Sequence, residues 1–412
     1  MAGNGIVAGV STERLARIDE HLQQKYIEPR EIAGALTLVA RHGEVVHHSP
    51  VGMMDIEREK PMQEDTIFRI YSMTKPITSI AMMMLYEEGR FQISDPLHDF
   101  IPEWRNQRVF VSGNHPNYMT TPVERPMMVR DLLSHQSGLT AGFINRTNVD
   151  AAYRTVGLGS ATLGAARPRE FTLAEMVKAL AEVPLEFSPG TAWNYGISTD
   201  VVGHLIEVIS SQSFDDFLRE RIFEPLGMVD TGFSVPEEKV DRFAANYNRG
   251  ADGKLQLMDD PAESKYLKPP VMPSGGGGLT GTSDDYWRFC QMLLNGGEFN
   301  GERIVGPKTI ELMTMNHLPG GQGLSAMAKG LFSETTSDGV GFGLGFAVVK
   351  DVARTQVSGS VGSYYWGGAA STAFWVDPEE DLTVVFMTQF MPSGTQPFRG
   401  ELRQLAYSSI VD

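Results

Sequence analysis

Segments with strand character lie near the two ends of the 412-residue chain, and the part between them contains few. Near the start, residues 35–40 and 44–47 flank a short Arg-His-Gly turn, which predicts an antiparallel hairpin. Near the end, apolar segments at 343–349, 371–376 and 382–388 have the same character. Helical segments begin, interrupt and end this pattern. We therefore expect an α+β fold, in which one antiparallel sheet is built from both chain ends and carries helices on its faces.

The chain between residues 96 and 270 differs, because Pro and Gly separate short helical segments and strand signals are sparse. We predict a mostly helical lobe here, inserted into an α/β lobe made of residues 1–95 and 271–412, with the active site between the two. Within the helical lobe, residues 106–126 are polar and contain prolines, so we expect a loop of the kind that borders a binding cleft. A chain of 412 residues is long for a single core, which fits two lobes.

Charge and cysteine content exclude several classes of function. The chain has 51 acidic and 35 basic residues, a formal charge of -16, which argues against a nucleic-acid or anionic-membrane partner. Its single cysteine, Cys290, has no partner for an intramolecular disulfide. The start of the chain lacks the basic and apolar regions of a signal peptide, and no stretch approaches the roughly 18 apolar residues of a membrane span. We therefore expect a cytoplasmic protein, whose oligomeric state the sequence does not indicate.

No pattern in the chain predicts a metal ion or an organic cofactor. His47 and His48 are adjacent, but no second cluster has ligand spacing, so we interpret them as strand-end histidines. The glycine-rich segment 273–282 lacks the Gly-Lys-Ser/Thr ending of a phosphate-binding loop. We expect its glycines to permit a tight return path between the lobes.

The short motif that most clearly suggests chemistry is Ser72-Met73-Thr74-Lys75, at a predicted helix start. Residues i and i+3 share one face of a helix, so the Ser72 hydroxyl and the Lys75 amine can converge as a nucleophile and a base. Pro76 suits a first helical turn, and the apolar run at 80–85 predicts a buried and therefore rigid helix. Free backbone N–H groups at this helix start would favour an oxyanion. The same four-residue spacing also arises by chance at ordinary helix starts.

A second informative stretch follows a turn at Pro189-Gly190. The turn is expected to place the next residues at a cleft edge, and among them we select Tyr195 as a catalytic candidate. The alternative for Tyr195 alone is an aromatic ring packed beneath a loop. His135 lies at the end of a short predicted helix, where histidine complements the helix dipole, so we do not assign catalysis to it.

Together these motifs resemble those of the serine β-lactamase and penicillin-binding-protein superfamily, and in particular its family VIII carboxylesterases. The agreement extends over most of the chain and implies a β-lactamase-like fold. The segments that carry it are Ser72-Met73-Thr74-Lys75, Leu132-Leu133-Ser134-His135-Gln136-Ser137-Gly138-Leu139, Pro189-Gly190-Thr191-Ala192-Trp193-Asn194-Tyr195, Gly276-Gly277-Gly278-Leu279 and Trp366-Gly367-Gly368.

The resemblance implies a role for each matched residue. Ser72 would be the acylated nucleophile, with Lys75 and Tyr195 as the pair that handles protons. Trp366-Gly367-Gly368 would be the strand that lines the substrate, and the backbone N–H groups of Ser72 and Ala369 would form the oxyanion hole. Which of Lys75 and Tyr195 is the general base stays open. An ammonium ~4 Å from a phenolate stabilises it by ~4 kcal/mol at an effective dielectric of ~20, but a desolvated neutral lysine would serve equally well.

Two positions depart from the β-lactamase relatives. Those proteins carry Lys-Thr-Gly where this chain has Trp366-Gly367-Gly368, and Tyr-Ala-Asn or Ser-x-Asn where it has Tyr195-Gly196-Ile197. An aromatic side chain thus replaces a cation that would hold a substrate carboxylate, and burying a carboxylate without a cation is costly. We therefore predict a serine carboxylesterase that hydrolyses short-chain neutral esters through a Ser72 acyl-enzyme.

Several other functions on the same scaffold remain open: β-lactamase, D-amino-acid amidase or peptidase, and acyltransferase. A non-catalytic ligand-binding homologue is less expected, because Ser72, Lys75 and Tyr195 are all present. An α/β-hydrolase is excluded, because no serine has glycine both two residues before and two residues after it. The expected partner is a small-molecule ester.

Overall fold

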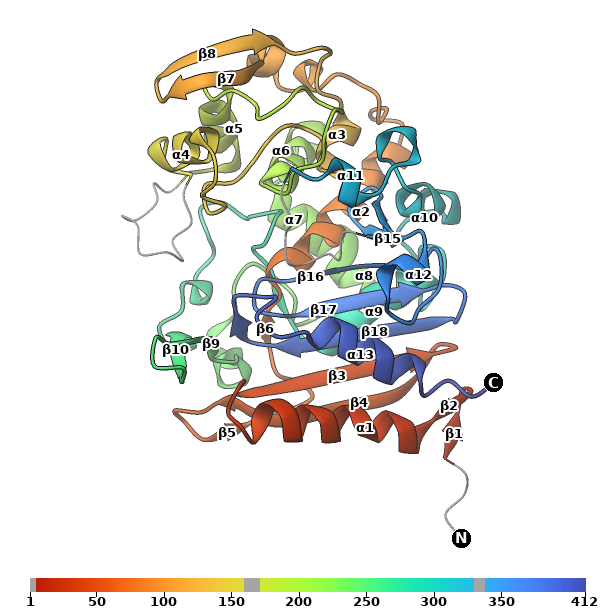
Figure 1. The fold of residues 1–412 in the computed structure, drawn as a ribbon. Coiled ribbons are helices and arrows are strands. Elements are labelled where there is room, and N and C mark those ends of the chain that lie inside the picture. Colours follow the sequence, from red (N-terminus) through yellow and green to blue (C-terminus); the bar gives the residue numbers. More distant parts are fainter. Residues whose placement is uncertain (1–4, 159–170, 330–337) are drawn as a thin grey trace.

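The computed structural model describes residues 5–158, 171–329 and 338–412, and its central element is an eight-stranded sheet (Figure 1). The strand order is β14-β15-β16-β17-β18-β3-β4-β5, and every neighbouring pair is antiparallel. The five C-terminal strands lie together, the three N-terminal strands lie together, and the two groups meet where β18 pairs with β3. The bounds of the strands are β14 (Val340–Phe342), β15 (Ala347–Val349), β16 (Tyr364–Gly367), β17 (Ala373–Asp377), β18 (Leu382–Thr388), β3 (Gly34–Arg41), β4 (Glu44–Asp55) and β5 (Lys60–Pro61).

The pairing of β3 with β18 joins the N-terminal and C-terminal parts of the sheet. Its register places Leu38 opposite Val385. Every residue of both strands is buried, so this central pair contributes side chains to the core on both faces. The predicted α+β fold, with one antiparallel sheet built from both chain ends, is confirmed.

Helices cover both faces of the sheet. Helices α1 (Thr12–Leu22) and α13 (Phe398–Tyr407) lie side by side on one face, and α9 (Ser283–Leu294) covers the other (Figure 1). Cys290 on α9 is fully buried, and burial raises the pKa of its thiol, so it behaves as a small core hydrophobe. Within the described ranges, no helix is both long enough and apolar enough to cross a membrane.

Helix α2 (Thr74–Glu87) runs between the sheet and the helical part of the molecule. Its residues 74–85 are all buried, and it packs against α6 (Ser198–Ser210). A short 3₁₀ turn, Tyr71–Met73, precedes it and carries Ser72. A helix that is apolar all round must be covered on every side, and this is the rigid mount that the run at 80–85 predicts.

The segment 96–270 contains short helices and also strands. The expected loop at 106–126 is wrong: β7 (Arg108–Asn114) and β8 (Asn117–Pro122) form an antiparallel hairpin there. Most of its residues are exposed, so the burial pattern that normally identifies a strand is absent from its sequence. A second group of strands, β9 (Asn246–Arg249) with β10 (Leu255–Asp259), pairs with β19 (Phe390–Met391) from the end of the chain. The helices of this segment are α3 (Val129–Leu133), α4 (Asn148–Thr155), α5 (Leu173–Ala181), α6, α7 (Phe214–Leu218) and α8 (Glu224–Leu226).

Candidate active site

Two residues selected from the sequence lie within hydrogen-bonding distance of a third, Ser72. Ser72 Oγ is 2.5 Å from Tyr195 Oη and 3.1 Å from Lys75 Nζ. Lys75 Nζ also lies 4.5 Å from the centroid of the Tyr195 ring. All three side chains are buried, so water screens their interactions weakly. The arrangement places two groups that can exchange protons on a single hydroxyl.

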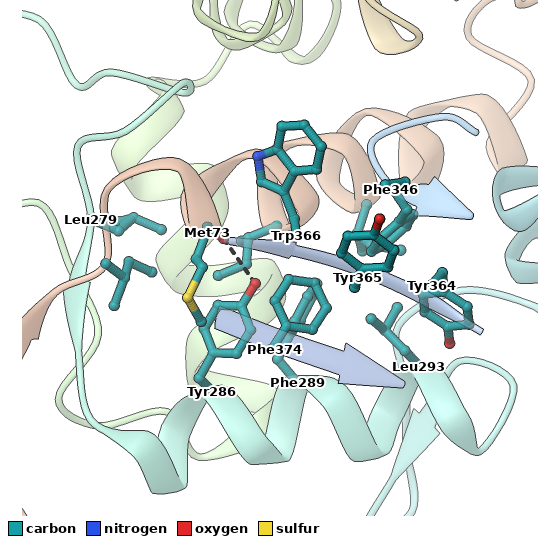
Figure 2. Close-up of a cluster of buried hydrophobic side chains, with 14 of the residues drawn as sticks. Met73, Leu279, Tyr286, Phe289, Leu293, Phe346, Tyr364, Tyr365, Trp366 and Phe374 are labelled. Atoms are coloured by element: carbon teal, nitrogen blue, oxygen red, sulfur yellow. Dashed lines mark hydrogen bonds between the residues drawn. The ribbon is translucent and has the colours of Figure 1, made fainter. Parts of the chain in front are cut away.

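The backbone immediately before Ser72 has an unusual conformation. Tyr71 has a φ of +43°, in a region that residues other than glycine rarely adopt. From α9, Tyr286 donates its hydroxyl hydrogen to the Met73 carbonyl at 2.9 Å, on the other side of Ser72 (Figure 2). Such a conformation persists only where the surroundings determine it. The position of Ser72 is therefore set in part by a helix more than 200 residues away in sequence.

The glycine-rich segment links Lys75 to a buried carboxylate. Lys75 Nζ donates to the Gly276 carbonyl at 2.6 Å. Asp200, near the start of α6, accepts from Ser274 Oγ at 2.5 Å and from the Gly276 N–H at 3.1 Å. A Cβ at position 276 would lie 2.5 Å from Asp200 Oδ2, so a larger residue does not fit. Asp200 thus fixes the position of the glycine-rich segment, and the Gly276 carbonyl of that segment in turn positions the Lys75 ammonium.

Asp200 is a site residue that was not predicted from the sequence. The available signal was an acidic residue inside a helix that is otherwise largely apolar, since Asp and Glu are seldom buried without a specific partner. Its partners, however, lie 74 and 76 residues further along the chain, and no local pattern connects them.

Two segments that carry the family resemblance run together beneath Tyr195. Asn194, the residue before it, donates from its backbone N–H to the His135 carbonyl at 2.9 Å. The Asn194 side chain donates to the Leu139 carbonyl at 3.0 Å. The residues 132–139 therefore form the support that positions the Tyr195 backbone.

His135 packs in an aromatic cluster next to Tyr195. Its ring centroid lies 5.2 Å from that of Tyr195 and 5.9 Å from that of Trp193. Burial, with a smaller contribution from the charge of Lys75, lowers the pKa of His135 to about 3. Its Nδ1 is buried and has no hydrogen-bond partner among the described residues. The imidazole is thus neutral near physiological pH, which fits a packing role and not that of a proton acceptor.

On the sheet side, Trp366 from β16 stacks on Tyr195. The two ring centroids are 5.7 Å apart at an interplanar angle of 29°, and Phe342 meets the indole edge-on at 5.4 Å. Figure 2 shows this indole projecting from the strand away from α9. Only 1% of Trp366 is exposed, so its first effect on the site is to hold the Tyr195 ring. Contact between Trp366 and a substrate stays a prediction.

The glycines after Trp366 bring the strand close to the Ser72 turn. A Cβ on Gly368 would lie 2.5 Å from the Ile70 carbonyl oxygen, two residues before Ser72, whereas Gly367 pairs with Ala373 of β17. Ala369 follows directly. The assignment of the Ser72 and Ala369 N–H groups to an oxyanion hole, and of Gly367 and Gly368 to substrate binding, stays a prediction.

The adjacent histidines of β4 have ordinary protein partners. His47 Nε2 lies 3.2 Å from Asp19 Oδ1, and His48 Nε2 lies 2.9 Å from Ser283 Oγ. In the part of the chain that the structure describes, no three His, Cys, Asp or Glu side chains are arranged to hold a metal ion.

Comparison with known proteins identifies the family of this chain. The model of the family described as Beta-lactamase matches residues 19–408. The chain belongs to the beta-lactamase family. Among individual relatives, protein Rv1367c of Mycobacterium tuberculosis is 34% identical over 364 residues, which are 88% of this chain and 86% of that protein. Esterase EstB of Burkholderia gladioli is 29% identical over 408 residues, 95% of each chain. The superfamily inferred from the motifs is confirmed.

Solved structures of beta-lactamase-like proteins agree with this fold. EstCE1, described as a hydrolase with promiscuous acyltransferase activity, superposes with a TM-score of 0.80 at 25% identity, over 96% of this chain and 99% of its own. The unliganded selenomethionyl form of simvastatin synthase LovD from Aspergillus terreus gives a TM-score of 0.78 at 21% identity, over 96% and 97%. At that identity, LovD supports the fold alone.

Proposed function

We propose that this beta-lactamase family protein is a serine carboxylesterase that hydrolyses short-chain neutral esters. Its relationship to EstB and EstCE1 supports a serine hydrolase or acyltransferase. The observation that carries the proposal is the position of Ser72 Oγ, 2.5 Å from Tyr195 Oη and 3.1 Å from Lys75 Nζ in a buried setting. A serine hydroxyl is a weak nucleophile until such groups activate it.

In the proposed reaction, Ser72 Oγ attacks the ester carbonyl and its proton passes to Tyr195 Oη, the nearer of its two neighbours. Lys75 Nζ, held by the Gly276 carbonyl, stabilises the phenolate by ~4 kcal/mol at ~4 Å and an effective dielectric of ~20. The N–H groups of Ser72 and Ala369 receive the oxyanion. Tyr195 then returns the proton to the leaving alcohol. Water attacks the acyl-Ser72 ester with Tyr195 again as base, and Tyr195 passes that proton to Ser72 Oγ as the bond to the acyl group breaks and the carboxylic acid leaves.

The preference for neutral esters rests on position 366. A buried indole stands where β-lactamase relatives carry a lysine, and it packs against Tyr195. A substrate carboxylate at this strand would lose hydration without gaining that ammonium. An uncharged ester has no such loss, and its apolar groups gain from an aromatic wall.

The test combines labelling with a substrate comparison. A fluorophosphonate probe followed by peptide mass spectrometry should modify Ser72 and no other serine. In the parent protein, kcat/KM for p-nitrophenyl butyrate should exceed that for a chromogenic cephalosporin. Trp366→Lys should lower this ratio and Trp366→Phe, which keeps an aromatic ring on Tyr195, should not. A parent that prefers the cephalosporin would contradict the proposed substrate class.

Acyl transfer is a second candidate function, favoured by the likeness to EstCE1. An acyl-Ser72 ester that meets an alcohol in place of water gives a new ester by the same steps in reverse. Incubation with vinyl butyrate and increasing concentrations of 1-butanol would divide the products between butyrate and butyl butyrate. Exclusive formation of butyrate at every alcohol concentration would restrict the protein to hydrolysis.

A further inference from the structure

A cavity of about 330 Å³ lies between strands β16 and β17, the segment 393–397 and the start of α13. Tyr365, Trp375 and the residues of α13 that line it lie on the face of the sheet opposite to Tyr195, because successive strand residues point to opposite faces. Trp366 also borders it. Trp366 stacks on Tyr195, whereas its neighbour Tyr365 meets the guanidinium of Arg403 from α13, 4.4 Å from the ring centroid. None of the three proposed catalytic residues lines the cavity.

The lining of this cavity, which we call the α13 cavity, has a charge opposite to that of the whole protein. Two arginines, Arg399 and Arg403, border it, and no Asp or Glu is among the described residues that do. The chain as a whole has 51 acidic residues against 35 basic ones. Much of the remaining wall is apolar or aromatic, including Val349, Tyr365, Trp375 and Phe398. The α13 cavity therefore combines positive charge with a surface that favours apolar groups.

Two hydrogen-bond donors on the α13 side of the cavity have no acceptor among the described residues, and Trp366 Nε1, on the Tyr195 side of strand β16, is a third. Arg403 Nη2 and Trp375 Nε1 are buried and lack hydrogen-bond partners within the described part of the chain. Both are donors only, and the guanidinium lies 5.3 Å from the Trp375 ring centroid. The indole of Trp375 is 1% exposed, so bulk water does not replace a missing partner. An unsatisfied buried donor costs about 1–3 kcal/mol, which an acceptor from a ligand would recover.

We propose that the α13 cavity binds a small apolar carboxylic acid as its carboxylate. The carboxylate accepts hydrogen bonds from Arg403 and from the Trp375 indole, and the apolar part of the acid packs against Tyr365 and Val349. A planar two-oxygen anion matches a guanidinium, and a volume of about 330 Å³ holds a molecule the size of a phenylalkanoate. The proposal does not depend on the chemistry at Ser72.

Isothermal titration calorimetry with 3-phenylpropanoate and its neutral amide, 3-phenylpropanamide, tests the proposal on the full-length protein. The carboxylate should bind at least about tenfold more tightly than the amide. Arg403→Met should weaken the carboxylate by about tenfold or more and leave the amide little changed. Trp375→Phe, which removes only the indole N–H donor, should weaken the carboxylate by about threefold.

Control variants separate the α13 cavity from other cationic positions. Arg303→Met, on a surface strand, and Lys75→Met, beside Ser72, should both keep the parent affinity for 3-phenylpropanoate. Arg403→Lys keeps the charge and should bind more tightly than Arg403→Met, and it serves if the Met variant does not fold. Equal affinity for acid and amide, absence of binding to the parent, or a loss caused by Lys75→Met and not by Arg403→Met would overturn the proposal.

Discussion

The two faces of strand β16 differ in how the polar groups at their centre are connected. On the Tyr195 side, an unbroken series of hydrogen bonds runs from Tyr195 through Ser72, Lys75 and Gly276 to Asp200. On the α13 side, Arg403 Nη2 and Trp375 Nε1 are buried without an acceptor in the described chain. A series with every member partnered is already in its working geometry, which suits a reaction site. Donors without partners leave interaction energy to be gained on binding, which suits a ligand site.

The largest expected effect is a loss of ester hydrolysis that leaves ligand binding on the α13 side of β16 intact. Ser72→Ala removes the proposed nucleophile, so ester hydrolysis should fall by at least about 10³-fold while the melting temperature stays close to that of the parent. Binding of 3-phenylpropanoate at the α13 cavity should be unchanged. Ser112→Ala, on the exposed hairpin, is the matched control and should retain activity. Near-parent turnover by a folded Ser72→Ala protein would remove Ser72 from the mechanism.

The next largest effect tests whether Lys75 and Tyr195 act as one catalytic unit. Lys75→Met and Tyr195→Phe should each lower kcat/KM by about 10²–10⁴-fold, and the double variant should lose little more than the worse single variant. The reason is that both groups act on the same Ser72 proton. Losses that multiply in the double variant would show that Lys75 and Tyr195 act independently.

A smaller loss is expected from Asp200, a positioning residue two hydrogen bonds from Lys75 Nζ. Asp200→Asn should lower kcat/KM by about 10–100-fold, mainly through kcat. Removing a buried negative charge near Lys75 disfavours the ammonium, so the alkaline limb of the pH–rate profile should move to lower pH. Asp216→Asn, which changes an exposed side chain of α7, is the control. A lower rate with an unmoved profile would indicate a structural role only.

The smallest effect concerns His135, whose Nδ1 is buried on the Tyr195 side without a partner among the described residues, as are the indole nitrogens of Trp193 and Trp366. Burial lowers its pKa to about 3, whereas an unfolded histidine titrates near 6.5. Below about pH 6.5 the unfolded chain therefore binds a proton that the folded protein does not. The stability present above that pH is lost as the pH falls, by about 1.4 kcal/mol at pH ~5.5. Urea unfolding at pH ~7.5 and ~5.5 should show a smaller loss in His135→Gln, and equal losses would contradict this origin.

The sequence predicted elements whose signal is local. The apolar run at 80–85 predicts α2, and the short apolar segments at both ends predict the sheet, because burial leaves its trace within one segment of sequence. The spacing of Ser72 and Lys75 was equally readable. The turn at Pro189-Gly190 made Tyr195 a candidate, and the family resemblance then supplied its role.

The remaining features depend on contacts between distant segments. Asp200 meets Gly276 across 76 residues, and Arg403 reaches Trp375 from another element altogether. The hydrophobic periodicity of a single segment does not indicate contacts of this kind. The β7–β8 hairpin was missed for a different reason, since exposed strands have no buried face to mark them.

Because β3 pairs with β18, the central sheet cannot be completed until almost the whole chain has been synthesised. More than 300 further residues must be synthesised before β18 can pair with the free edge of β3. Similarly, 213 residues separate Met73 from Tyr286, whose hydroxyl donates to the Met73 carbonyl. Contacts of such long range slow folding and leave a strand edge open to other chains meanwhile. Early folding intermediates of this protein are therefore without a working centre, and aggregation competes with its maturation until the last strands arrive.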